Sequence, residues 1–234
     1  MKAPSQIWAI VKKDVVMELR TKEMVTAMLL FSIISMVIFS VAFANLGRAT
    51  EIGVDIDLTQ VSGGLLWTAF AFMSLLGLNR SFVHEKDEGC LDGLLLAPME
   101  RWVIFFGKML GNMIFIGLVE IISVPIFTLF FIRAAWLGRA GWMLLVLLLA
   151  NTGVCTLGTL LATISVNTKA RDLLLPVLLL PVLIPLLIFA VRATTTVITG
   201  EGFDQMGMLL SSMVVYDVIF TLASYALYDF VIGE

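Results

Sequence analysis

Residues 24–46 read MVTAMLLFSIISMVIFSVAFANL, a run without one charged side chain. A helix needs about 20 apolar residues to cross the hydrocarbon core of a bilayer, so this run is long enough to span it. The whole chain has the same character, with 60% hydrophobic residues, 14% charged residues and a mean hydropathy of +1.03. Soluble domains contain roughly 45–50% apolar and about 25% charged residues. The sequence therefore predicts an integral membrane protein.

Five further runs are long and apolar enough to span, and two of them contain a single acid, Glu120 or Asp217. Because lipid cannot hydrogen-bond exposed backbone groups, runs this uniformly apolar predict helices rather than alternating barrel strands. We expect an all-α membrane protein whose residues 1–234 form a single transmembrane domain. Its six predicted spans are residues 24–46, 60–82, 106–132, 141–167, 173–191 and 206–228.

The lysines and arginines between the spans predict the orientation, because cytoplasmic loops carry an excess of them. With the N-terminus inside, eleven of the fifteen basic residues lie in cytoplasmic segments and four lie in outer loops. We therefore expect both termini to be cytoplasmic.

The segment before the first span, residues 4–22, has the pattern of an amphipathic helix. Trp8, Val11, Val15 and Leu19 recur at spacings of three and four, with basic side chains on the other faces. Such a helix lies on the inner leaflet with its basic side toward the headgroups. It is either a simple anchor or a connecting helix that transmits force to the first span.

A second charged segment, residues 84–102, reads HEKDEGCLDGLLLAPMERW and falls between two apolar runs on the predicted cytoplasmic side. Leu91, Leu94 and Leu95 form one apolar stripe on a short helix that Pro98 terminates. This helix is too short to span. Its stripe needs a partner groove, either in the protein's own bundle or in a soluble subunit.

This segment resembles the cytoplasmic coupling segment of ABC-2 type transporter permeases. The residues that carry the resemblance are Glu85, Gly89, Leu91, Leu94, Leu95, Pro98 and Arg101. More closely, residues 67–108 and the run LLLPVLLLPVLIPLLIFAVRAT at 173–194 resemble the cytochrome c maturation protein B family, CcmB. The resemblance implies the ABC-2 type permease fold and an ATPase-coupling role for those residues.

The chain has no G-x-x-x-x-G-K-[ST] phosphate loop, and its nearest phrase, FFGKM at 105–109, lacks the second glycine. We therefore expect a permease subunit that is not an enzyme, with ATP hydrolysed by a separate subunit. The resemblance implies that this subunit is CcmA and that the permease pairs with a second copy of itself. It also implies three haem-handling partners in the bacterial inner membrane and periplasm, CcmC, CcmD and the chaperone CcmE.

No cofactor, metal or nucleic acid is expected to bind the chain directly, with haem handled by the complex. The single histidine, His84, is a surface residue more often than a ligand, and Cys90 and Cys155 are placed too differently for a disulfide. Glu120 and Asp217 should face protein, as gates or as acids that pack against polar side chains of another helix. Pro176, Pro181 and Pro185 should kink or break the fifth span, for packing alone or as a hinge.

Two functions follow from these observations. In one, ATP-driven motion serves haem delivery or the release of haem-loaded chaperone during cytochrome c maturation. In the other, the chain is the permease of an ABC-2 exporter for a lipid, polysaccharide or drug. The spans show no polar stripe in five of six helices, and this favours the release role.

Overall fold

The structure, a computed structural model, describes residues 3–48, 58–87, 99–131, 137–166, 168 and 171–231. All regular elements among these residues are helical, which confirms the predicted fold class. The helices are α1 (Ala3–Thr21), α2 (Glu23–Arg48), α3 (Leu58–Asp87), α5 (Arg101–Phe131), α6 (Ala140–Val166), α7 (Arg171–Thr199) and α8 (Met206–Val231), with short 3₁₀ turns η2 (Leu137–Arg139) and η3 (Phe203–Gln205).

Six of these helices, α2, α3 and α5 to α8, are long and apolar enough to cross a membrane, as predicted. The predicted boundaries differ most in α7, which continues past residue 191 to Thr199 with the exposed Arg192 inside the helix. A charge near a helix end is compatible with a span because a long basic side chain extends its head to the interface. The helix that precedes the spans, α1, begins and ends close to the predicted bounds of 4 and 22.

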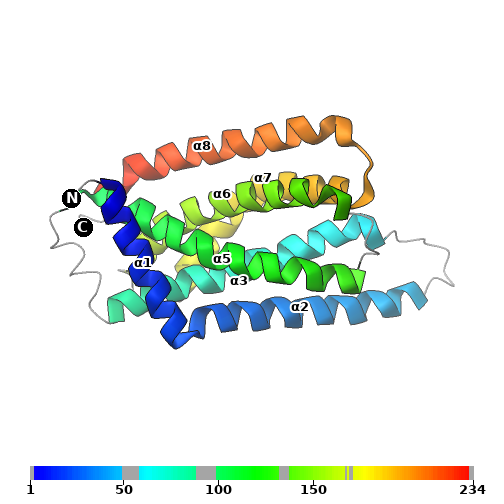
Figure 1. The fold of residues 1–234 in the computed structure, drawn as a ribbon, viewed down its shortest axis with the longest axis horizontal. Coiled ribbons are helices and arrows are strands. Elements are labelled where there is room, and N and C mark those ends of the chain that lie inside the picture. The colour runs from blue at the N-terminus through cyan, green and yellow to red at the C-terminus, as the bar shows by residue number, and fades with distance from the viewer. Residues whose placement is uncertain are drawn as a thin grey trace.

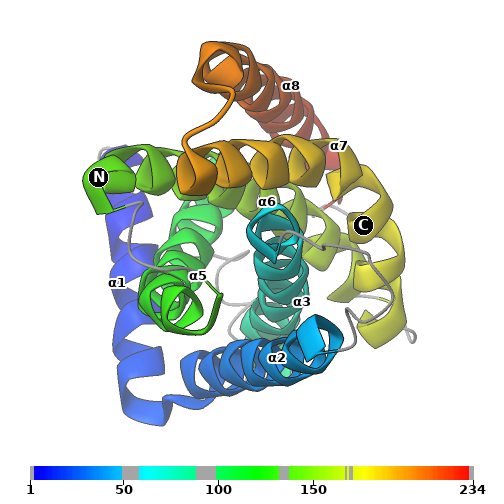
Figure 2. The ribbon, with the colours of Figure 1, turned by 90° about the vertical axis from the view of Figure 1, so that its right-hand side faces the viewer.

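The six long helices run lengthwise through the molecule, and α1 crosses one end of the bundle (Figure 1). We call this end the α1 end. The start of α1, the last turns of α3 and α8 and the first turn of α5 all lie there (Figure 1). Viewed end-on, α2 and α8 occupy opposite edges (Figure 2). Between them, α6 contacts α3, α5, α7 and α8. The bundle is therefore arranged around α6.

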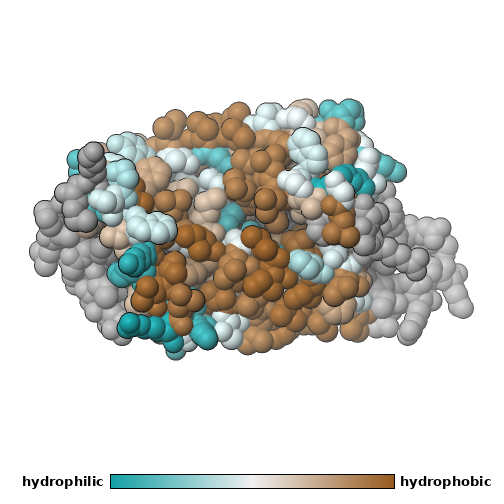
Figure 3. Space-filling model, viewed as in Figure 1, coloured by the Kyte–Doolittle hydropathy of each residue, from teal (hydrophilic) through white to brown (hydrophobic). Residues whose placement is uncertain are grey.

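The outer surface fits a bilayer. Most of the face in Figure 3 is apolar between the two ends, and hydrophilic residues gather toward the ends. Large apolar side chains such as Ile38, Leu129 and Leu222 are more than half exposed on three different helices. In a soluble protein such a surface would be unusual, whereas in a membrane it faces lipid tails.

The contact between α3 and α7 shows how closely these helices approach. Trp67 donates its indole N–H to Thr194 Oγ1 at 2.9 Å, and both side chains are buried. One turn earlier, a Cβ at Gly63 would lie 2.6 Å from Thr195 Oγ1 and 3.0 Å from the Val191 carbonyl oxygen. The α3–α7 distance therefore depends on the missing side chain at Gly63, as in other small-residue contacts between membrane helices.

Replacing Gly63 with Ala should destabilise the bundle relative to Gly64→Ala, because a Cβ at Gly64 would meet nothing within 4 Å. Both changes gain the same helix propensity, so their difference isolates the cost of overpacking, about 1–3 kcal/mol. Thermal unfolding in detergent measures it. Equal melting temperatures for the two variants would contradict the close α3–α7 contact.

Candidate functional site at the α1 end

The predicted coupling segment joins α3 to α5 at the α1 end. Glu85 lies in the last turn of α3, and Arg101 is the exposed first residue of α5. The remaining residues assigned to coupling lie outside the described part of the chain; they are Gly89, Leu91, Leu94, Leu95 and Pro98. Their role stays a prediction, but the two helices that flank them are placed.

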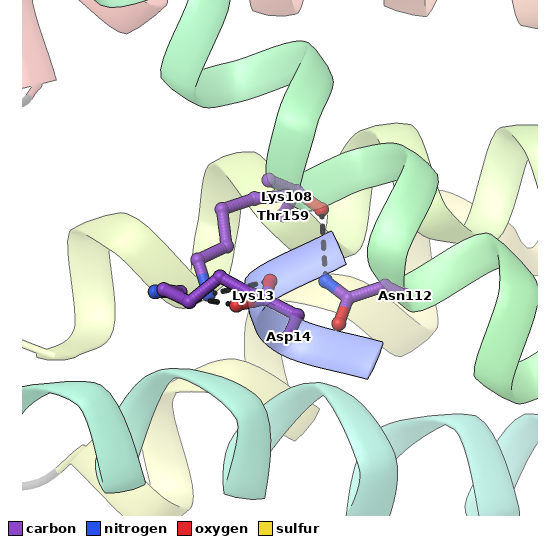
Figure 4. A network of polar contacts seen from close by, with 5 residues as sticks. All are labelled: Lys13, Asp14, Lys108, Asn112 and Thr159. Atoms are coloured by element: carbon purple, nitrogen blue, oxygen red, sulfur yellow. Dashed lines mark hydrogen bonds and ion pairs between the residues drawn. The ribbon is translucent and has the colours of Figure 1, made fainter. Parts of the chain in front are cut away.

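A buried ion pair holds α1 against α5. Lys108 Nζ lies 2.9 Å from Asp14 Oδ2, and the two side chains are only 2% and 8% exposed (Figure 4). The half-exposed Lys13 approaches the other carboxylate oxygen at 3.2 Å. Removing two charges from water is costly, so a buried pair forms only where the geometry is good. This pair fixes where α1 crosses α5.

Two glycines of α5 let α1 come this close. A Cβ at Gly107 would lie 2.9 Å from the Ile10 side chain, and one at Gly111 would lie 3.2 Å from Asp14 Oδ2. Small residues four apart on a membrane helix are a common contact face for another helix. The phrase FFGKM, which fails as a phosphate loop, is thus part of the surface that receives α1.

The other acid of α1 is directed to α2. Glu18 Oε1 accepts the backbone N–H of Val25 at 2.8 Å, so it satisfies a free donor in the first turn of α2. Between the helices, Lys22 adopts a left-handed conformation with φ of 56°. The α1–α2 connection is therefore a tight elbow.

A cleft of about 280 Å³ lies beside this elbow, between α1, α2, α3 and α5. Its lining includes both members of the buried pair, and Arg80 of α3 lies 3.8 Å from Glu23 of α2 across it. Both Arg80 and Glu23 are exposed, so their ion pair adds little stability. At this cleft, residues from the start of α2, the last turns of α3 and the first half of α5 all lie close to α1.

The predicted apolar stripe of α1 is divided by the fold. Val11 is buried, whereas Trp8 and Leu19 are 65% and 66% exposed. Sequence spacing identified an amphipathic helix but not which apolar side chains α5 would cover. Trp8 and Leu19 are left on the outer surface of α1.

One of the six spans, α6, has a buried polar stripe. Asn151, Cys155 and Thr159 recur every fourth residue on α6 and are all buried. Asn151 donates to the Met113 carbonyl at 3.0 Å, and Cys155 donates to Asn151 Oδ1 at 2.9 Å. Figure 4 shows the third bond, in which Thr159 accepts from Asn112 at 3.2 Å. Asn151 and Thr159 bond α6 to α5, so the stripe is a helix contact.

The two intramembrane acids face protein, as predicted. Glu120 is 2% exposed and Asp217 is 6% exposed. Neither Asp217 oxygen nor Glu120 Oε2 has a hydrogen-bond partner among the described residues. Asp217 instead packs against α6, where a Cβ at Gly153 would lie 2.6 Å from Oδ1.

The three prolines of α7 do not break it, because the helix is continuous from Arg171 to Thr199. Pro181 and Pro185 are exposed and Pro176 is half-buried. In the same region, Tyr216 of α8 donates its hydroxyl to the Val182 carbonyl at 2.8 Å. A proline weakens the hydrogen bonding of carbonyls in the preceding turn, and this contact compensates for it.

Within the described residues, no group of three or more His, Cys, Asp or Glu side chains is placed to hold a metal ion. The functional features of this end are therefore polar and apolar contacts between helices.

Comparison with known proteins identifies the family. Residues 5–230, from the first turn of α1 almost to the end of α8, match the family described as CcmB, CcmB protein. The chain belongs to the CcmB family. The α1 helix and its ion pair with α5 thus lie inside the family region, as do all six apolar helices.

Three relatives of this CcmB-family chain are each named heme exporter protein B. The chain is 34% identical to the Rhodobacter capsulatus protein over 56% of its own length and 60% of that protein's. It is 32% identical to the Paracoccus denitrificans protein, over 74% and 75% of the two chains. It is 30% identical to the Pseudomonas aeruginosa protein, over 82% and 84%.

Replacing Lys108 with Met should lower the free energy of unfolding by about 3 kcal/mol, because Asp14 keeps a buried charge without its nearest partner. Combining Lys108→Met with Asp14→Leu should recover most of the loss. Lys13→Gln is the matched control on the same acid and should cost at most about 1 kcal/mol. Thermal unfolding, with hydrogen exchange of the α1 amides, measures all three. Similar losses for Lys13→Gln and Lys108→Met would show that the buried contact is not the important one.

Proposed function

We propose that the chain is the membrane-spanning permease subunit of an ABC transporter-type complex that acts in cytochrome c maturation. The observation that carries this proposal is the CcmB family match over the whole helical bundle, from residue 5 to residue 230. The match to the Pseudomonas aeruginosa protein named heme exporter protein B covers 84% of that protein's length. The complex uses ATP hydrolysis to support haem delivery or the release of haem-loaded periplasmic chaperone.

ATP is hydrolysed by a separate subunit, CcmA, that docks at the α1 end. The coupling segment between α3 and α5 is the dock, with its leucine stripe in a groove of the ATPase. The positions of Glu85 and Arg101 in the helices on either side support this arrangement. A stripe of three leucines suits a groove, since each buried leucine contributes roughly 1.5–3 kcal/mol.

Motion of the docked segment would reach the bundle by two routes. The first is direct, because α3 and α5 continue from the segment into the membrane as unbroken helices. The second passes through α1, which is held to α5 by the Asp14–Lys108 pair and to α2 by Glu18. These contacts support the interpretation of α1 as a connecting helix rather than a simple anchor.

The release of haem-loaded chaperone is favoured over passage of a substrate through this chain. Asn151 and Thr159 of α6 are engaged in bonds to α5, and Thr156 lies within hydrogen-bond distance of Thr221 on α8, so these polar groups are used in helix contacts. The haem-handling partners are CcmC, CcmD and CcmE, and a second copy of the permease completes the assembly. The complex lies in the bacterial inner membrane with the α1 end in the cytoplasm.

The orientation can be tested by cysteine labelling in a Cys90→Ser background, since the other cysteine, Cys155, is fully buried. Thr21 and Glu201 are exposed at opposite ends of the bundle. A membrane-impermeant maleimide added to intact cells should label Glu201→Cys and leave Thr21→Cys unlabelled until the membrane is opened. The reverse pattern would invert the topology and place the ATPase dock on the wrong side.

Replacing Leu94 and Leu95 together with Asp should abolish copurification of the ATPase, because two carboxylates would be desolvated against an apolar groove at several kcal/mol each. Glu85→Ala and Arg101→Ala should reduce ATP-dependent function more than assembly, since polar contacts at a groove rim mainly fix geometry. Copurification, ATPase rate and cytochrome c yield are the measurements.

The matched control is Leu137→Asp, at an exposed leucine in η2 at the other end of the bundle. It adds an acid outside the proposed dock and should leave the ATPase bound. Undiminished copurification of the Leu94→Asp, Leu95→Asp protein would rule out this segment as the dock.

A further inference from the structure

An apolar groove of about 420 Å³ runs between α1 and α5 on the outer surface of the α1 end. Ile7, Trp8 and Val11 line it from α1, and Trp102, Leu110 and Ile114 line it from α5. Tryptophan is enriched where the hydrocarbon core meets the headgroups, because its ring is apolar and its N–H is polar. The groove therefore lies at the depth of the membrane interface.

The groove is continuous with the lipid-facing surface of α5. Leu110 and Ile114 line the groove and are also partly exposed, and Leu118 and Ile121 extend the same exposed stripe toward the middle of the span. Residues four apart lie one above the other on a helix. A chain lying along this stripe would pass directly from the bilayer into the groove. This geometry suits a lipid tail better than a folded partner.

The charges of α1 on this side are positive. Its two acids are turned inward, Asp14 to Lys108 and Glu18 to the backbone of α2. Lys12, one turn from Trp8, and Arg20 remain exposed on the outer face. A second groove, about 650 Å³ in volume, lies on the opposite side of α1 and is lined by Lys12, Lys13 and Arg20. Lys12 is the basic residue of this set that is closest in angle to Trp8, so it lies between the two grooves.

We infer that α1 and α5 bind an anionic phospholipid, with one acyl chain in the apolar groove and the phosphate beside Lys12. Ammonium groups bind phosphate as strongly hydrated point charges, and an anionic leaflet attracts basic side chains near its surface. The acyl chain gains from burial among the apolar groove residues, and Lys12 selects anionic over neutral headgroups. The site is independent of the proposed role in cytochrome c maturation.

A photo-crosslinkable lipid tests the site directly. The purified full chain is placed in nanodiscs of phosphatidylcholine that contain a small fraction of phosphatidylglycerol with a diazirine on one acyl chain. After illumination, mass spectrometry locates the crosslinks. They should concentrate on peptides that contain Trp8 or Ile114. A phosphatidylcholine probe with the same diazirine should label these peptides less.

Two pairs of variants separate the tail from the headgroup. Leu110→Trp fills the groove and should reduce groove labelling about tenfold, the effect of losing contact with roughly two methylene groups. Leu129→Trp, at an exposed leucine near the other end of α5, should leave it unchanged. Lys12→Gln should reduce labelling by phosphatidylglycerol about fivefold and that by phosphatidylcholine little. Arg192→Gln, at an exposed arginine near the other end, is its control. Hydrogen exchange of the α1 amides identifies any variant in which α1 has detached.

Three results would overturn the inference. One is equal labelling of the groove and of an ordinary lipid-facing position such as Leu222 on α8, which would indicate general contact with the bilayer. Another is equal labelling by the two probes with α1 in place. The third is a copurifying protein that shields the groove from both lipids, which would make the occupant a protein.

Discussion

The bundle depends on polar and close contacts between helices, because leucine gains little from packing on leucine rather than on lipid tails. Several of these contacts involve α6, whose Asn151 and Thr159 bond to α5 while Thr156 lies 3.4 Å from Thr221 of α8, oxygen to oxygen. In the most apolar part of each candidate span, 67% of the residues are buried in α3 and in α6, against 22% in α2 and 28% in α8. Two inner helices therefore organise the bundle, and the outer helices are free to face lipid or partners.

The fold was predictable from the sequence because its strongest signal, long runs without charge, is also what a bilayer requires of a helix. The predicted ends were less accurate, since a charge was taken to end a span. Arg192 stays within α7, and α5 begins at Arg101 rather than at residue 106. The sequence expectation did not assign the polar stripe to α6, because threonine and cysteine differ little from apolar residues in hydropathy, although Asn151, Cys155 and Thr159 show the four-residue spacing of one helix face.

The site was only partly predictable. The coupling motif could be recognised in the sequence, but most of that segment lies outside the described residues. The contact that the structure adds, Asp14 with Lys108, joins residues that are 94 positions apart. No local pattern specifies such a pair. Two weaker signals were present: an acid directly after two lysines in α1, and glycines four apart on either side of a lysine in α5.

The arrangement of α1 also determines where a force at the α1 end would go. Its two acids bind different helices, so α1 cannot follow the start of α5 without also moving the start of α2. Among the candidate spans, α2 has the smallest share of buried residues. Its main contacts are with α3 and α5 and not with α6, the helix around which the bundle is arranged. A displacement of α5 would thus be transmitted to the helix that is easiest to move. The buried ion pair favours this outcome because its energy falls steeply once the geometry is lost, which makes the link rigid over small displacements.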